Sequence, residues 1–211
     1  MQSMKEIREA LHQALNKRLE PIGFKYKTSE HSHIRPTAIG RESFHVAYLY
    51  YDHLCVAADV AVRFDELEDL LNATRSWLSP RERRSTYSLG AELGNIAGTG
   101  YRRWDVLSLD EVERVADDVV ASFRSIGLPY LERASSLESA YRLLATPGRA
   151  AWLHAPIHWD RAQCLVGLAL LTGRKNELPR IVDDCVRMLE ELKDPNLKDF
   201  LGFLDKMGIK R

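Results

Sequence analysis

The chain has 211 residues, of which 45% are hydrophobic and 28% are charged, and 30 basic side chains balance 30 acidic ones. This length and composition are typical of a globular protein with a sizeable core. The zero net charge gives no electrostatic indication of a nucleic-acid partner or of binding to an anionic membrane. No apolar run reaches the length of a membrane span, and the first fifteen residues lack the apolar core of a signal peptide, so we expect no membrane segment.

Three cysteines, Cys55, Cys164 and Cys185, lie far apart in apolar stretches. An odd number of separated cysteines is typical of buried free thiols rather than of a disulfide framework. We therefore expect a reducing compartment, the cytoplasm.

The N-terminal segment carries the signals of one amphipathic helix. Ser3 and Glu6 have the spacing of a capping box, and an apolar residue recurs every three or four positions as far as Leu19. Pro21 and Gly23 are expected to stop the helix. A short strand then follows at 24–27, and the polar stretch 31–36 is interpreted as an edge strand or a loop.

The clearest pattern in the chain is a change of apolar period at Phe64. Segment 44–51 is apolar on both faces, and in segment 54–64 the even positions are apolar. Asp52 and His53 separate the two segments, so we expect a β-hairpin. From Asp65 the apolar residues fall three and four apart as far as Trp77 and Leu78, which predicts an amphipathic helix with Asp65 as its cap.

The later half changes from mixed to helical patterns. A strand is expected at 104–107, and a second capping box at Ser108 and Glu111 is expected to open a helix that Gly127 closes. After Leu128 and Pro129 every pattern is helical. Four more helices are expected, with starts near residues 135, 160, 178 and 195.

These elements predict an α+β fold. We expect an antiparallel sheet of four or five strands packed with helices in residues 1–127, followed by a C-terminal helical subdomain, residues 128–211, packed on it.

Histidines are the first candidates for chemistry. In a strand, His31 and His33 would share one face, and His53 lies at a turn. No spacing indicates the third ligand that a metal site needs. Two exposed histidines on a polar edge are the simpler interpretation, and we predict neither a metal nor a cofactor.

An aromatic segment gives the second candidate site. Trp152, His154, His158 and Trp159 lie close in sequence, and Pro156 interrupts any helix between the two histidines. Loop aromatics that pack between helices are the favoured interpretation. The alternative is an aromatic pocket with two polar groups, a common form of small-ligand site.

A glycine-rich loop gives the third candidate site. Gly98, Thr99 and Gly100 precede Arg102 and Arg103, so free backbone N–H groups would lie near two guanidinium groups. Such a loop could hold a phosphate or a carboxylate, although it matches neither the P-loop nor the dinucleotide fingerprint. Solvated arginines on a flexible hairpin are the other interpretation.

Taken in order, several short motifs carry a resemblance to a known family. An N-terminal helix leads to Gly23, Phe24 and Lys25 at a strand start, and Trp104 later precedes a helix and the step from Leu128 to Pro129. With these motifs the first two-thirds of the chain resembles an uncharacterised bacterial family, of the domain of unknown function 4304 type. The family has no established catalytic residues. Some small bacterial α+β proteins of this appearance are immunity proteins or partner-binding modules.

Two functions remain open at this stage. The favoured one is a cytoplasmic, non-catalytic binding module, immunity-like or regulatory, with a protein partner, since no nucleophile motif such as G-x-S-x-G occurs. The alternative is a small-molecule or anion-binding protein, or a hydrolase of unidentified class. Its site would use Trp152 to Trp159, or Arg102 and Arg103.

Overall fold

The structure is a computed structural model that describes residues 3–210, and the chain divides into two compact units. Unit 1 covers Met1–Val62 and Gly90–Arg133, and unit 2 covers Arg63–Leu89 and Ala134–Arg211. The fold is α+β, with an antiparallel sheet, covering helices and a C-terminal group of helices, so the predicted class is confirmed.

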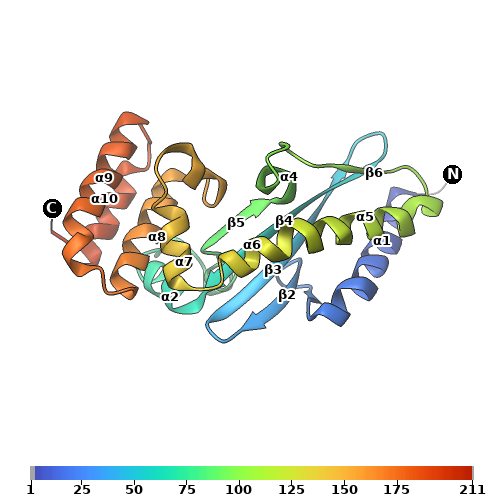
Figure 1. The fold of residues 1–211 in the computed structure, drawn as a ribbon, viewed down its shortest axis with the longest axis horizontal. Helices are drawn as coiled ribbons and strands as arrows, with labels where there is room; N and C mark the ends of the chain where they lie inside the picture. The colour runs from blue at the N-terminus through green and yellow to red at the C-terminus, as the bar shows by residue number, and fades with distance from the viewer. Residues whose placement is uncertain (1–2, 211) are drawn as a thin grey trace. The chain divides into compact units, whose positions relative to one another are not determined.

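Unit 1 is built on a six-stranded sheet (Figure 1), in which β1-β2-β3-β4-β5 are neighbours and β6 also pairs with β4. The strands are β1 (Lys25–Lys27), β2 (Ser32–Thr37), β3 (Gly40–Tyr50), β4 (Leu54–Phe64), β5 (Leu89–Glu92) and β6 (Trp104–Val106). The helices are α1 (Met4–Leu19), α4 (Leu93–Ile96), α5 (Val112–Ser122) and α6 (Leu128–Arg133), and a short π-helix, Phe123–Gly127, joins the last two. The last two residues of β4 and the first of β5 fall in unit 2.

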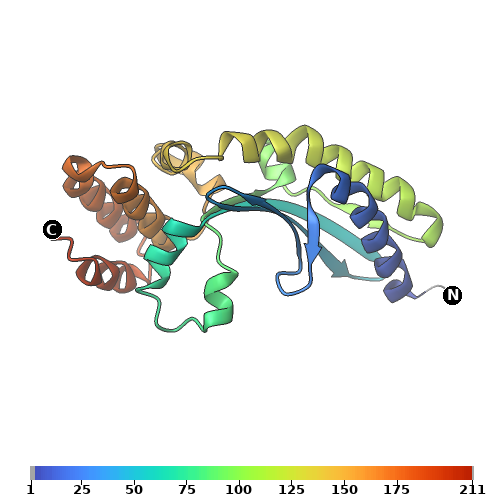
Figure 2. The ribbon, with the colours of Figure 1, turned by 90° about the horizontal axis from the view of Figure 1, so that it is seen from below.

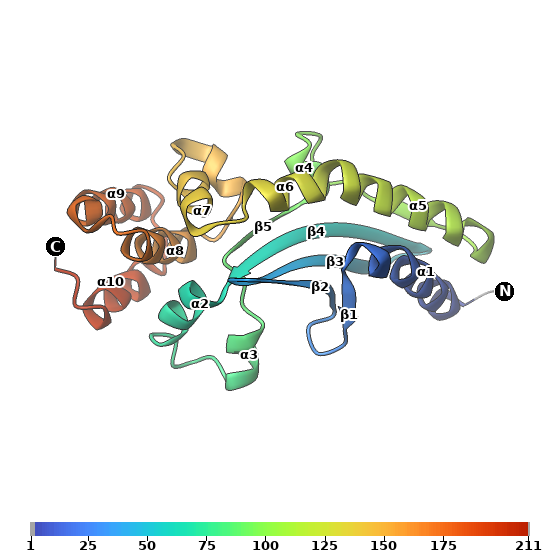
Figure 3. The same cartoon turned by 60° about the horizontal axis from the view of Figure 1, so that its bottom comes forward.

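One face of the sheet in unit 1 is covered by helices. Figures 2 and 3 show α5 and α6 running along this face, with α1 beside α5. Phe123 stacks on Phe44 of β3 at 4.3 Å between ring centroids and meets Phe24 edge-on at 5.0 Å. All three rings are fully buried, so they form the centre of the core of unit 1.

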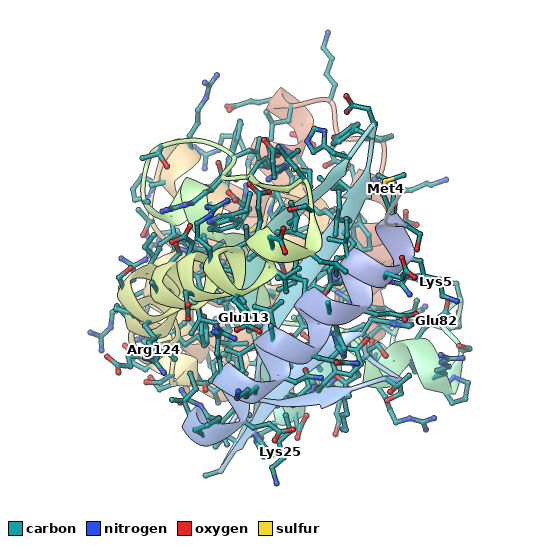
Figure 4. All side chains as sticks on the ribbon, turned by 90° about the vertical axis from the view of Figure 1, so that its right-hand side faces the viewer. Met4, Lys5, Lys25, Glu82, Glu113 and Arg124 are labelled. Carbon is teal, nitrogen blue, oxygen red and sulfur yellow. The ribbon has the colours of Figure 1, made fainter. Side chains whose placement is uncertain are left out.

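Helices α1 and α5 are also joined by a forked ion pair. The Arg18 guanidinium donates from Nη2 to Glu113 Oε2 at 2.7 Å and from Nε to Asp117 Oδ1 at 2.8 Å. Glu113 and Asp117 lie one helical turn apart, which brings both carboxylates to one face of α5. Figure 4 views this pair of helices, with Glu113 labelled on α5.

Unit 2 is helical and is centred on α8. Its helices are α2 (Asp65–Asn72), α3 (Pro80–Arg84), α7 (Leu137–Leu144), α8 (His158–Leu171), α9 (Leu178–Glu191) and α10 (Leu197–Lys206). Helix α8 contacts α2, α7, α9 and α10, and most of its side chains are buried. A helix surrounded in this way must be apolar on nearly every side, as α8 is from Cys164 to Leu171.

Segment 63–89 belongs with the C-terminal helices for two reasons. A Cβ atom at Gly167 of α8 would lie 2.6 Å from Leu67 Cδ1, so the two helices approach as closely as a glycine permits. Arg75 binds Asp160 and also donates to Gln163 Oε1 at 2.9 Å. The unit boundaries therefore differ from the expected division into residues 1–127 and 128–211, because these contacts join segments that are distant in sequence.

The capping predictions have mixed outcomes. Ser3 and Glu6 form the expected capping box, with Ser3 N donating to Glu6 Oε2 at 2.9 Å. The box predicted at Ser108 is wrong, because Glu111 instead accepts a hydrogen bond from the backbone of Leu107.

The helix after β4 also starts and ends differently from the prediction. The N-cap of α2 is Phe64, and the Asp65 carboxylate accepts from Arg63 Nε at 2.7 Å rather than capping the helix. Helix α2 ends at Asn72, so Trp77 and Leu78 lie outside it. The chain turns here, and Arg75 reaches α8.

Gly127 does not close a helix, contrary to the prediction. It lacks the positive φ of a helix C-terminus, and the chain continues through it into α6. A Cβ atom at Gly127 would lie 2.6 Å from Phe123 Cδ2 and 3.0 Å from Val60 Cγ1. Glycine is required here because the turn lies directly on β4, not because the chain changes direction.

This contact makes Gly127→Ala a test of the core of unit 1. The added methyl group must displace the Phe123 ring or β4, so we expect the free energy of unfolding to fall by about 1–3 kcal/mol. Gly202→Ala in α10 is the matched control, since its Cβ would meet nothing within 4 Å, and it should gain about 0.5–1 kcal/mol from helix propensity. Urea denaturation followed by circular dichroism measures both, and equal effects of the two substitutions would contradict the packing argument.

Candidate functional site

Strand β3 of unit 1 is longer than the strand beside it. The pairing of β2 with β3 runs from Thr37 opposite Gly40 back to His33 opposite Phe44, near the start of β2. Strand β3 continues to Tyr50, and within residues 3–210 its neighbours are β2 and β4 alone. The edge of β3 beyond Phe44 therefore has no pairing strand.

The direction of the free backbone groups follows from the register. Thr37 and Gly40 close a two-residue hairpin and so form a hydrogen-bonded pair, which means that the even residues of β3 bond toward β2. Tyr51 N bonds to His53 O at 3.0 Å, as expected if the odd residues bond toward β4. The N–H and C=O groups of Val46, Tyr48 and Tyr50 therefore point to the free edge.

A pocket of about 600 Å³ lies along this edge. It is lined by the consecutive residues His45, Val46, Ala47 and Tyr48. Successive side chains of a strand point to opposite faces, so a pocket that touches four in a row borders the edge of the strand rather than one face. We call this pocket the β3 groove. Its other wall is α1, through Arg8, Glu9, His12 and Gln13, and its end is formed by Tyr26, Thr28, His31 and His33.

Two neutral histidines are linked at the closed end of the β3 groove. His33 Nε2 donates to Asn16 Oδ1 at 2.7 Å, and Asn16 Nδ2 donates to His12 Nε2 at 3.1 Å. Burial, with repulsion from His12, lowers the pKa of His33 to about 4, and burial also lowers the pKa of His12. Both rings are therefore neutral at pH 7, and His33 Nδ1 is the hydrogen-bond acceptor of its ring.

Two buried polar atoms of the groove have no partner among residues 3–210. His33 is 2% exposed, and its Nδ1 accepts no hydrogen bond; the nearby Phe44 backbone favours the charged ring but is not in bonding geometry. The Tyr48 hydroxyl is also buried without a partner, and burial raises the pKa of Tyr48. Buried polar atoms in native proteins are normally satisfied, so both atoms can bond to a group that enters the groove.

Arg8 supplies the charge at the open end of the groove. Its Nη1 donates to the Tyr50 hydroxyl at 3.3 Å, and no carboxylate within residues 3–210 forms an ion pair with it. The adjacent Glu9 is 4.0 Å from Lys5 instead. A carboxylate bound in the groove near Tyr50 would complete the pairing of Arg8.

The structure separates the histidines that the sequence analysis considered together. His31 lies in the turn before β2 with φ of 51°, and both it and His33 line the β3 groove. His53 lies elsewhere, between Asp52 at 2.8 Å and Asp105 at 3.0 Å. Within residues 3–210 no group of three or more His, Cys, Asp or Glu side chains is arranged to hold a metal ion.

The predicted anion loop of unit 1 already contains a carboxylate. Glu92 Oε1 accepts from the backbone N–H of Arg102 at 2.9 Å and lies 3.8 Å from Arg103 Nη1. Its Oε2 accepts from Asn95 N, which caps α4. Arg102 also lies over the Trp104 ring at 5.1 Å. The geometry expected for an external anion is thus occupied by Glu92 of the same chain.

The aromatic candidates of unit 2 fall into two groups. The ring centroids of Trp152 and His158 are 4.7 Å apart, and Trp152 lines a second pocket of about 540 Å³. Trp159 instead faces Trp77, at 6.4 Å, and the Arg75 guanidinium.

The two histidines of this segment do not share the pocket. His154 is buried, and neither it nor His158 lines the cavity beside Trp152. The polar side chain that does reach this cavity from the start of α8 is Arg161, which was not among the predicted site residues.

No local sequence pattern points to the residues that form the β3 groove. His12, Asn16, Tyr26 and Tyr48 come from three elements that lie up to 36 positions apart, so their convergence depends on the fold. Arg161 carries no such signal either, because Asp160 and Gln163 beside it make the start of this helix polar in sequence.

Comparison of the chain with protein-family models, with curated proteins and with solved structures found no match. In the described chain, no helix combines the length and the apolar character of a membrane span.

The neutral state of His33 predicts a pH-dependent stability. His33 binds a proton near pH 6.5 in the unfolded chain and near pH 4 in the folded chain. The free energy of unfolding should therefore fall as the pH drops through this window, by at most about 1.4 kcal/mol per pH unit. His33→Gln retains an N–H donor toward Asn16 but does not titrate. Its free energy of unfolding should therefore fall less than that of the native protein between about pH 7 and about pH 4.5. His31→Asn is the control, and urea denaturation at both pH values is the measurement. Equal losses in His33→Gln and the native protein would contradict the assignment.

Proposed function

We propose that the protein is a non-catalytic binding module whose unit 1 takes up an extended peptide segment of a partner protein along the β3 groove. The observation that carries the proposal is the lining of the groove by four consecutive residues of β3, which puts an unpaired strand edge inside a pocket. An extended peptide can add there as a further strand. The free groups of Val46, Tyr48 and Tyr50 would supply its main-chain hydrogen bonds.

The energetics support a peptide rather than a single small group. Three residues offer about six backbone hydrogen bonds, each with a net contribution of about 0.5–1.5 kcal/mol. Ordering the peptide opposes this gain, so side-chain contacts must add affinity. The groove offers such contacts in the buried His33 Nδ1, the Tyr48 hydroxyl and the aromatic wall of Tyr26.

The charges of the groove indicate the chemistry of the peptide. Arg8 at the end near Tyr50 has no carboxylate partner in the described chain, so we propose an acidic side chain or a C-terminal carboxylate at this end. His33 at the other end is a neutral acceptor and suits a side chain that donates an N–H or O–H. A module that binds a peptide segment of its partner, and so keeps that segment from other contacts, fits a regulatory or immunity-like role.

The buried thiols support a reducing compartment for this module. Cys55, Cys164 and Cys185 are all free and buried in the structure. We propose the cytoplasm as its location, since free thiols persist there.

A phage-displayed library of random heptapeptides, selected on the full chain, tests the proposal. We expect enrichment of peptides with an acidic residue, and a synthetic peptide of the selected sequence should slow amide hydrogen exchange at Val46 and Tyr48. Tyr48→Pro removes one groove-facing N–H without removing a bond to β4, so it should weaken binding about tenfold or more. Tyr48→Phe is the matched control, because it removes the hydroxyl but keeps the backbone N–H. Arg8→Gln should remove the preference for acidic peptides.

Two results would contradict the proposal. One is a selected peptide that protects amides outside β3 and binds Tyr48→Pro unchanged. The other is self-association of the native protein in sedimentation experiments that Tyr48→Pro abolishes, which would assign the edge to a second copy of the chain.

A further inference from the structure

A buried arginine in unit 2 has no carboxylate partner. Arg161, in the first turn of α8, is 4% exposed; its Nη1 donates to Ala155 O at 3.1 Å and its Nη2 lies 2.9 Å from Met188 Sδ. A guanidinium group has five N–H donors, and no carboxylate within residues 3–210 lies in ion-pair distance of this one. Burial lowers the pKa of Arg161, as expected for an uncompensated cation.

The other buried arginines of unit 2 are satisfied within the chain. Arg63 bonds to Asp65 and lies 3.9 Å from Glu68, and Arg75 bonds to Asp160. A buried charge without a partner is costly, so native proteins normally provide one. The exception at Arg161 therefore indicates a counter-ion that comes from outside the chain.

Arg161 faces a pocket that can hold such a ligand. The pocket, of about 540 Å³, is lined by residues of α7, α8, α9 and the segment that carries Trp152. Its walls are largely apolar and include Leu144, Leu165, Ile181, Met188 and Leu192. Its other charged side chains, Arg180, Asp184 and Glu191, are exposed, so Arg161 is the buried one. An apolar cavity with a few polar groups that orient the ligand is the usual form of a small-ligand site.

The carboxylates at the rim do not fill this role. Asp184 lines the pocket, but its Oδ1 accepts from Arg187 Nη2 at 2.7 Å. Glu191 also lines the pocket, and its side chain is exposed. Neither forms an ion pair with Arg161 in the described chain.

We propose that this pocket binds a small organic carboxylate with an apolar body, such as a medium-chain acyl or aryl acid. The carboxylate accepts two hydrogen bonds from the Arg161 guanidinium, and the apolar body lies between α8 and α9 against Trp152. This site is independent of the β3 groove, because every residue that lines it belongs to unit 2.

Isothermal titration of the full chain with octanoate, octan-1-ol and inorganic phosphate tests the proposal. We expect octanoate to bind, and octan-1-ol and phosphate to bind at least tenfold more weakly, since each lacks one half of the recognised chemistry. Arg161→Met should weaken octanoate binding tenfold or more. Arg142→Met removes an exposed arginine, and neither Arg142 nor its partner Glu138 lines the pocket, so it should change octanoate binding less than twofold.

The stability of the variants separates a ligand site from a structural role. Removing an unpaired buried charge should leave the urea midpoint of Arg161→Met unchanged or raised. Arg161→Lys keeps the positive charge but loses the paired N–H donors of the guanidinium group. It should fold and bind octanoate with intermediate affinity, and it decides between the two roles if Arg161→Met fails to fold. Octanoate binding that is unchanged in Arg161→Met or in Arg161→Lys overturns the proposal, as does equal binding of octanoate and octan-1-ol. Binding of phosphate alone also overturns it.

Discussion

The sheet of unit 1 depends on the pairing of β4 along both of its edges. Strand β3 occupies one edge, and β5 and β6 occupy successive parts of the other. A strand with neighbours on both sides has its backbone groups satisfied in the sheet, so its side chains can be apolar on both faces. Residues 54–58 are all buried, as this position requires. The edges of the sheet are thereby left to shorter strands and to the overhang of β3.

That overhang carries the candidate function, because β2 is too short to cover it. The chain turns at His31 with a left-handed backbone conformation, and β2 pairs with β3 only as far as His33. An uncovered strand edge favours aggregation unless it is shielded. Here α1 forms a wall beside the edge, so access is restricted to a groove. The same geometry that shields the edge can select a single extended peptide.

The buried polar groups of the chain fall into two classes by their partners. Arg63 and Arg75 meet carboxylates or amides of the same chain, and they stabilise the arrangement of unit 2. His33 and Arg161 are buried to a similar extent, and each lines a pocket; within residues 3–210 His33 Nδ1 has no hydrogen-bond partner and Arg161 has no carboxylate partner. Desolvation makes the burial of His33 and Arg161 unfavourable unless a ligand or solvent supplies the hydrogen-bond partners. Contact with a pocket distinguishes the two proposed sites, because Glu68 Oε2, Asn72 Oδ1 and Gln163 Nε2 of the structural network are also buried without a partner among residues 3–210.

The sequence by itself determined the α+β class, the strand over residues 54–64 and its junction with a helix, and the capping box at Ser3. These features depend on neighbours a few positions apart, so periodicity and local hydrogen bonding reveal them. Only the tertiary structure decided that Gly127 continues a helix, that β3 has an open edge and that Arg161 lacks a carboxylate. Each depends on which distant segments meet, and local patterns do not specify those contacts.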